Sequence, residues 1–237
     1  MKQRICSKAA ELSKVEFSYT NSCNFDIVNT LDLDCSGLVM DAVVFALKIK
    51  NIPLLLKTGK RLAARIYKIY YHTLLEISKE TGGYLNCYSP DSFLIIYPKE
   101  RNNVSDVVNI ALKTAELISM DLREVFEPHG HINFAIGIDT GNVLGTKTLC
   151  NNQYSQSVWF GTAIDKAFTI ADQCNRPFFV GVSGTVFHHL SEDLLTTTKR
   201  ILGIKKKVDL WTKQTYMFDN VKKHLYQTNF HKNFDEE

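Results

Sequence analysis

The feature that most constrains the fold is a continuous run of six apolar residues at positions 42–47. The run reads AVVFAL and contains both β-branched and aromatic side chains. A run this short and unbroken is typical of a β-strand buried on both faces, because a strand with one exposed face shows alternating polar residues. The sequence therefore predicts a sheet in which this strand is covered on both sides.

Helices and further strands are expected on either side of this run. Apolar residues at three- and four-residue spacing predict a long helix within 54–81, closed by Gly82-Gly83. Two β-rich segments flank the turn residues Pro90-Asp91 and predict a hairpin. A second helix is expected over 105–126, with Ser105 as a possible N-cap. The other expected helices are 162–174 and 184–190. The other expected strands are 132–138, 157–160, 178–182 and 211–218, with a glycine-containing turn after 138.

Helices and strands that alternate irregularly predict an α+β fold with a mixed or antiparallel sheet covered by helices. The length of 237 residues and the 45% hydrophobic content suit one domain over 39–220. We expect 1–38 to be an arm with one short helix at most, and 221–237 to be a tail. No apolar run reaches the roughly 18 to 20 residues of a membrane span, and the start lacks a secretory signal, so we expect a cytoplasmic protein.

The charge balance gives little reason to expect a nucleic-acid partner. The chain has 28 Lys and Arg against 25 Asp and Glu, a net charge of +3. The basic run Lys205-Lys206-Lys207 lacks interleaved aromatic residues, and we expect it to be a solvated loop. Six cysteines without a C-x-x-C pair indicate neither a zinc ribbon nor a disulfide framework.

Four segments, taken in order, resemble the class III nucleotidyl cyclases, and most closely the bacterial Pycsar-type pyrimidine cyclases. They are 43–51, the 82–91 hairpin, 136–145 and 158–167. The resemblance covers about residues 40 to 190 and implies that 39–220 is a cyclase-like domain with a ferredoxin-like βαββαβ core. It implies a head-to-tail dimer, with itself or with another cyclase-fold protein, that places a nucleoside triphosphate between the subunits. It also suggests a setting in bacterial antiphage signalling.

In that family two aspartates hold two divalent ions, Mg²⁺ or Mn²⁺, which activate the ribose hydroxyl and stabilise charge on the phosphates. Asp91 matches the hairpin aspartate. The strand-end position is occupied by Lys48, or by Leu47 if the alignment shifts by one residue, and neither side chain offers the oxygen ligand that these ions need. Lys48 either forms an ion pair with Asp91 in the space of the metals or points into solvent.

The family's Asn and Arg, one helical turn apart, correspond here to Asp165 and Thr169, so the catalytic positions of the helix are also altered. The implied nucleotide pocket comprises Lys48, Lys50, Asn51, Cys87, Val158 and Trp159. A cysteine in a strand is most often a packed thiol, and for Trp159 a core or dimer-interface position is favoured over stacking on a base.

Two functional hypotheses therefore remain open. The first is a pseudoenzyme that dimerises and binds a nucleotide or a protein, with no metal cofactor. The second is an active cyclase that uses Mg²⁺ or Mn²⁺ and makes a cyclic mononucleotide, alone or completed by a heterodimer partner.

Overall fold

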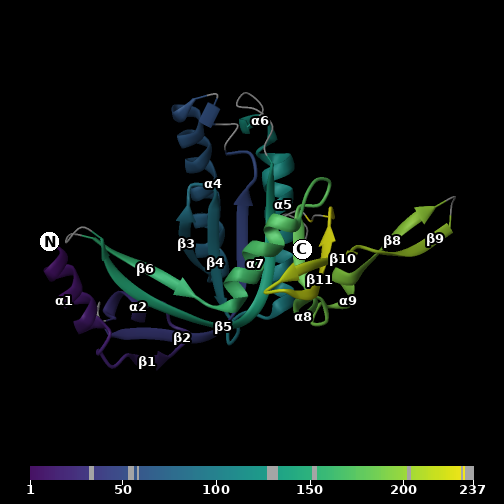
Figure 1. Ribbon diagram of the computed structural model, residues 1–237. Helices are drawn as coiled ribbons and strands as arrows, with labels where there is room; N and C mark the ends of the chain where they lie inside the picture. The colour runs from purple at the N-terminus through teal and green to yellow at the C-terminus, as the bar shows by residue number, and fades with distance from the viewer. Residues whose placement is uncertain are drawn as a thin grey trace.

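The computed structural model describes residues 1–31, 35–52, 56–57, 59–126, 133–150, 154–201, 204–230 and 232. The strands of its main sheet are β1 (Ser18–Asn21), β2 (Ser36–Ile49), β3 (Tyr84–Ser89), β4 (Ser92–Pro98), β5 (Phe134–Cys150), β6 (Tyr154–Phe160), β7 (Val180–Ser183), β10 (Thr212–Phe218) and β11 (Val221–Thr228). Their order is β10-β11-β7-β5-β2-β4-β3, with β1 beside β2 and β6 beside β5 (Figure 1). Most neighbours are antiparallel, but β1 with β2 and β5 with β7 are parallel. The predicted α+β class with a mixed sheet is confirmed.

Helices cover both faces of the sheet (Figure 1). The helical segments are α1 (Lys2–Leu12), α2 (Asp26–Thr30), α4 (Lys60–Thr81), α5 (Val104–Glu116), the π-helical turn η1 (Leu117–Asp121), α6 (Arg123–Phe126), α7 (Thr162–Gln173), α8 (Gly184–Phe187) and α9 (Glu192–Leu195). Within the described residues, no helix is long and apolar enough to cross a membrane.

Successive residues of β2 belong to two different cores. Val43, Phe45 and Leu47 pack with α4 and α5 on one face. Val44 and Ala46 pack with α2 and α7 on the other. Because side chains alternate along a strand, an unbroken apolar run is the pattern that fills both cores. The predicted burial on both faces is confirmed.

The long strands extend beyond the predicted ones. β2 includes the charged residues Asp41 and Lys48, because its backbone pairing with β4 and β5 continues past the apolar run. The glycine-containing turn expected after 138 is wrong, since β5 continues through it to Cys150. Gly145 lies in that strand because a Cβ there would come within 2.6 Å of the Trp159 ring.

The long helix is confirmed within its predicted range: it spans Lys60–Thr81 and is capped by Gly82, whose positive φ of 73° is the usual left-handed C-terminal cap. Two details of the second predicted helix need correction. The second helix is capped by Asn103, whose side chain accepts a hydrogen bond from the Asp106 amide, and not by Ser105. The Ser105 hydroxyl instead donates to the His189 carbonyl. The helix also breaks into α5, η1 and α6 instead of continuing to Phe126.

The terminal segments contain more regular structure than predicted. The arm contains two helices and a strand, so the expectation of one short helix at most is wrong. Of these helices, α1 buries no residue, whereas α2 is anchored by the buried side chain of Val28. At the other end, β11 lies inside the sheet between β10 and β7. The boundaries 1–38, 39–220 and 221–237 stay a prediction.

A separate two-stranded ribbon was not predicted. It consists of β8 (Thr196–Ile201) and β9 (Ile204–Asp209), which pair only with each other. The ribbon projects from the body of the molecule beyond α9 (Figure 1). The basic run 205–207 therefore lies in a strand and not in a loop.

Candidate functional site

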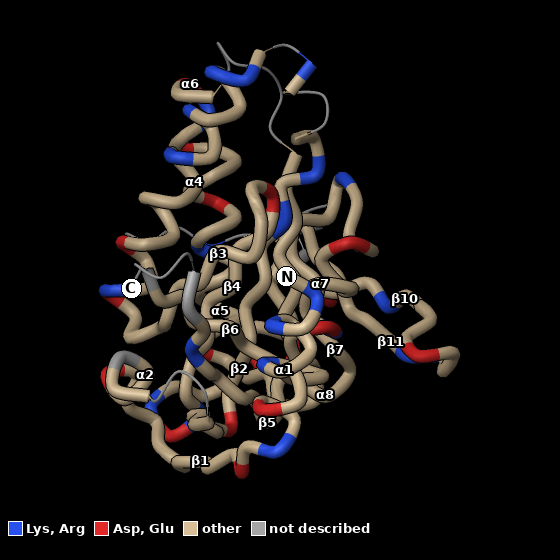
Figure 2. Tube along the Cα trace, turned by 60° about the vertical axis from the view of Figure 1, so that its left-hand side comes forward, with Lys and Arg blue, Asp and Glu red and all other residues tan. Residues whose placement is uncertain are grey.

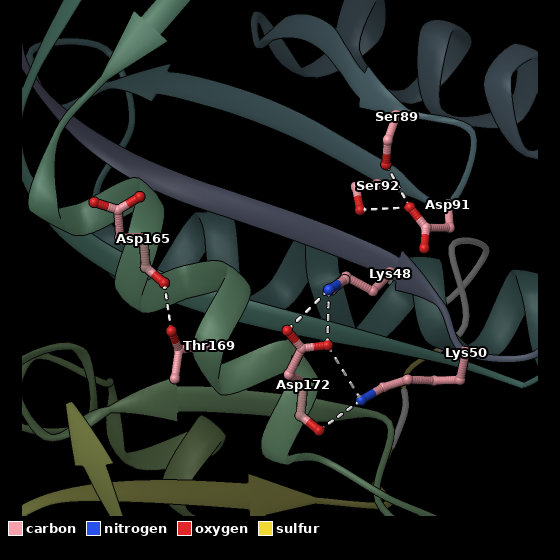
Figure 3. Close-up of polar contacts among 8 residues, drawn as sticks. All are labelled: Lys48, Lys50, Ser89, Asp91, Ser92, Asp165, Thr169 and Asp172. Atoms are coloured by element: carbon pink, nitrogen blue, oxygen red, sulfur yellow. Dashed lines mark hydrogen bonds and ion pairs between the residues drawn. The ribbon is translucent and has the colours of Figure 1, made fainter.

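The hairpin between β3 and β4 holds Asp91 at its tip (Figure 3). The hydroxyl of Ser92 donates to the Asp91 carboxylate at 2.9 Å, and the hydroxyl of Ser89 donates to the same oxygen. The Asp91 carbonyl also accepts a hydrogen bond of 2.8 Å from the Ile49 amide, which ties the tip to the end of β2. The predicted hairpin thus places Asp91 beside the strand end that carries Lys48.

Lys48 forms an ion pair, but its partner is Asp172 on α7 rather than Asp91 (Figure 3). Its ammonium lies 2.8 Å from the Asp172 carboxylate. Lys50 approaches the same residue, donating to the Asp172 carbonyl at 2.7 Å. Two lysines from the end of β2 therefore hold the C-terminal turn of α7, where a cation also complements the helix dipole. The prediction that Lys48 points into solvent is wrong, since its side chain is only 23% exposed.

The charges of these groups affect one another. Burial alone would raise the pKa of Asp91, but the Ser89 and Ser92 hydrogen bonds and the charge of Lys48 outweigh it, so the pKa lies below its ordinary value. Burial lowers the pKa of Lys50, although the Asp172 carboxylate opposes this effect. Asp91 is therefore ionised at neutral pH, next to a cluster of two lysines and one aspartate.

The donor set at this strand end does not suit a pair of divalent ions. Asp91 contributes one carboxylate, and the carboxylate of Asp172 is already bound by Lys48. Ammonium groups repel Mg²⁺ and Mn²⁺, which need oxygen ligands. Among the described residues, no three His, Cys, Asp or Glu side chains gather closely enough to hold a metal ion.

The two helix positions lie away from this cluster. Asp165 and Thr169 are one turn apart on α7, and the Thr169 hydroxyl donates to the Asp165 carbonyl at 2.8 Å. Asp165 is exposed and lies nearly two helical turns from Asp172 (Figure 3). The structure therefore brings together Lys48, Lys50 and Asp91 but leaves Asp165 and Thr169 outside their contacts.

Cys87 lies on the opposite face of the sheet from Lys48. It packs with the core beneath α4 and forms a hydrogen bond with Tyr67, and burial raises the pKa of its thiol. With Asp91 and Tyr67 it lines a groove of about 590 Å³ whose surface is mostly apolar. This position fits a packed thiol better than a residue that recognises a nucleobase, because Lys48 and α7 lie on the other face of the sheet.

The remaining predicted pocket residues have structural contacts. The Asn51 side-chain oxygen accepts a hydrogen bond of 3.4 Å from the Asn133 amide before β5. Val158 is half-buried in β6, where it pairs with Thr146. Trp159 is 2% exposed and packs against Phe25 and Tyr84, in agreement with the core interpretation.

Asp172 is the site residue that the sequence analysis missed. It lies seven residues after Asp165 and three after Thr169, so helical spacing places the three on one side of α7. That spacing is the signal that could have found it. Its pairing with Lys48, 124 residues away in the chain, is visible only in the structure.

A second carboxylate on the α7 face of the sheet is almost completely buried. Asp139 of β5 has a side chain that is 3% exposed, and its Oδ1 accepts a hydrogen bond of 2.5 Å from Ser183. Among the described residues its Oδ2 has no hydrogen-bond partner, although the ammonium of Lys166 lies 3.8 Å away and Tyr216 is nearby. Burial raises the pKa of Asp139, partly opposed by the Ser183 hydrogen bond.

We expect Asp139→Asn to become more stable relative to the native chain as the pH rises from about 4 towards 8. A carboxyl whose pKa is raised by folding contributes stability that is fully present below its ordinary pKa of 3.8 and is lost as the pH rises through the folded value. Asparagine keeps the acceptor for Ser183 without the buried charge. Urea unfolding at several pH values measures the difference. Asp41→Asn, which removes a more exposed carboxylate, is the control, and a pH-independent difference for Asp139→Asn would contradict the expectation.

Comparison with known proteins supports the fold assignment. No family model and no curated protein matches the sequence. Among solved structures, adenylyl cyclase CyaB from P. aeruginosa is 11% identical over 85% of this chain and 99% of that chain, with a TM-score of 0.65. A dimeric guanylyl cyclase domain from the fungus Blastocladiella emersonii is 15% identical over 81% of this chain and 98% of that one, with a TM-score of 0.59.

A class III adenylyl cyclase-like ATP-binding protein from Pseudomonas aeruginosa is also similar. It is 11% identical over 76% of this chain and 41% of that chain, with a TM-score of 0.61. At these identities the likeness concerns the backbone arrangement. The chain therefore has the α+β fold of the class III adenylyl and guanylyl cyclase domains.

Proposed function

We propose that the chain is a catalytically degenerate class III cyclase-fold protein, which dimerises and acts by binding a nucleotide or a protein partner. The observation that carries this proposal is the Lys48–Asp172 ion pair at the end of β2. It supports the proposal because the resemblance implies a metal-binding carboxylate at this strand end, where Lys48 supplies an ammonium instead. Of the two metal-binding carboxylates that the resemblance implies, Asp91 is then the one that this chain keeps.

The second half of the proposed degeneracy lies on α7. Asp165 and Thr169 stand in place of the amide and guanidinium side chains that the resemblance implies. Asp165 offers only an acidic group, and the Thr169 hydroxyl donates to the Asp165 carbonyl, so neither replaces the donors that would stabilise charge developing on a phosphate. Loss of a metal ligand or of one such donor each costs roughly 10²-fold or more in rate. Their combined loss favours a binding protein over an enzyme.

Two structural neighbours support the proposed nucleotide binding and the proposed dimerisation. One of them is described as a class III adenylyl cyclase-like ATP-binding protein, which shows that this fold can serve nucleotide binding in a cyclase-like protein. Another is a dimeric guanylyl cyclase domain. In this chain Lys48 and Lys50 would supply positive charge to phosphates, and Asp165 and Thr169 of the second subunit would face the same cleft. An antiphage setting rests on the Pycsar resemblance alone.

The second candidate is an active cyclase that is completed by a different subunit. The observation in its favour is that Asp91 remains ionised, with its pKa held low by two hydroxyl groups and Lys48. A partner subunit would have to supply the missing metal ligand and the missing transition-state donors.

Incubation with ATP, GTP, CTP or UTP and Mn²⁺ separates the two candidates. We expect no cyclic product from the native chain above the level given by Asp91→Ala, because Lys48 occupies the strand-end position and the Asp172 carboxylate nearby is bound by it. Product that Asp91→Ala abolishes would overturn the pseudoenzyme proposal. Chromatography with mass detection identifies the cyclic products.

Calorimetric titration with the same nucleotides then tests ligand binding. We expect heat with at least one of them, and an affinity about tenfold lower for Lys48→Gln, a change of about 1.4 kcal/mol. Lys99→Gln is a matched control, since Lys99 also pairs with an aspartate, Asp41, at 3.2 Å. If no nucleotide gives heat, nucleotide binding is excluded and a protein remains as the proposed partner.

A further inference from the structure

The β8–β9 ribbon is one of the strongly basic stretches of the chain. Residues 196–209 hold five of the 28 Lys and Arg and one of the 25 Asp and Glu, which leaves 23 basic and 24 acidic residues elsewhere. Acidic and basic positions are spread over the rest of the molecule (Figure 2), although residues 57–68, at the start of α4, also hold five Lys and Arg without an Asp or Glu. The modest net charge of +3 therefore hides a strongly cationic element on a body that is close to neutral.

The backbone register of the ribbon pairs basic residues with one another. Lys199 is opposite Lys206, and Arg200 is opposite Lys205. Lys207 is paired with Glu192, but among the described residues neither Lys205 nor Lys206 has an acidic partner. Lys205 and Lys206 are therefore the cations of the ribbon that an anionic partner could contact.

The cations of β9 are presented on both faces of the ribbon. Lys205, Lys206 and Lys207 are all exposed, and successive residues of a strand point to opposite faces. A flat membrane surface contacts one face of a ribbon. A nucleic-acid groove has phosphates on both sides, and the major groove of duplex DNA is wide enough for a two-stranded β-ribbon.

We propose that the β8–β9 ribbon binds double-stranded nucleic acid through its phosphates. Each strand has six residues and is about 20 Å long at roughly 3.3 Å per residue, which is long enough to lie in a groove. Residues 196–209 include no aromatic side chain to stack on unpaired bases, which favours a duplex over a single strand. Contacts to phosphates carry no base information, so the binding is independent of sequence and sensitive to salt.

Fluorescence anisotropy with a labelled DNA duplex of about 25 base pairs tests this proposal, with salt varied between about 50 and about 200 mM. The test variant is Lys205→Gln with Lys206→Gln, which keeps the Lys207–Glu192 pair. We expect its Kd at the lowest salt to rise about tenfold or more. We also expect the slope of log Kd against log salt to fall by about two, one for each lysine.

The matched control is Lys222→Gln with Lys223→Gln on β11, which removes the same charge from two exposed neighbours in another strand. Its Kd is expected to stay within about twofold of the native value, and both variants should keep the native melting temperature. An equal loss of affinity in the two variants would overturn the proposal, as would no duplex binding at about 50 mM salt. Ribbon-dependent binding to vesicles of anionic lipid without binding to the duplex would identify a membrane surface instead and would also overturn it.

Discussion

Gly137→Ala is expected to lower the free energy of unfolding by about 3 kcal/mol or more, because α7 lies directly on this residue. A Cβ at Gly137 would come within 2.0 Å of the Ala167 carbonyl oxygen and 2.5 Å of the Ala171 amide nitrogen. Both atoms belong to the helix backbone and cannot rotate away. The helix that carries Asp165, Thr169 and Asp172 would therefore have to move off the sheet.

Gly141→Ala is the matched control for this substitution. Gly141 lies four residues further along β5, and a Cβ there would make an ordinary contact of 3.4 Å with the Ala163 methyl group. We expect it to change the stability by less than about 0.5 kcal/mol. Urea unfolding followed by circular dichroism measures both variants. A Gly137→Ala protein within about 1 kcal/mol of the native chain would show that α7 is not packed as closely as the structure has it.

Trp159→Ala is expected to cost about 3–5 kcal/mol, the usual range for truncating a large buried aromatic residue. The centroid of its ring lies 6.0 Å from that of the Phe25 ring and 5.6 Å from that of the Tyr84 ring, and the tryptophan packs against β5 at Gly145. The substitution would therefore loosen the contact between α2 and the sheet as well as the β5–β6 pairing. Unfolding midpoints in urea measure the effect.

Phe160→Ala is the control for Trp159→Ala, because the neighbouring Phe160 is 53% exposed. It is expected to change stability by less than about 0.5 kcal/mol. The pair of variants also separates a core role from a ligand role for Trp159. Native stability combined with weaker nucleotide binding in Trp159→Ala would show that the tryptophan stacks on a base and would contradict the packing described above.

The fold class followed from the sequence because its signals are local. The unbroken 42–47 run, the Pro90-Asp91 turn and the Gly82 cap each report on a few neighbouring residues, and the structure confirms all three. The predictions fail where contacts between residues distant in the sequence determine the secondary structure. β5 continues through its glycines because β2 and β6 pair with it, and β8 and β9 form because each provides the other with a partner.

The candidate site divides in the same way. The sequence located Asp91 at a hairpin tip and Lys48 at a strand end, because turn and strand signals fix those positions. It could not select the partner of Lys48, since Asp91 and Asp172 are both acidic residues distant in the chain. The direction of the Lys48 side chain selects Asp172, and that direction depends on the register of β2 within the sheet.

The sequence by itself determined the class of fold, the strand buried on both faces and the identity of the charged residues near the strand end. The tertiary structure alone decided which charges meet: two lysines on Asp172, Lys166 near the buried Asp139, and Lys207 of the β8–β9 ribbon on Glu192. The physical reason is that hydrophobic periodicity is written along the chain, whereas electrostatic energy depends on distances in space that only packing sets.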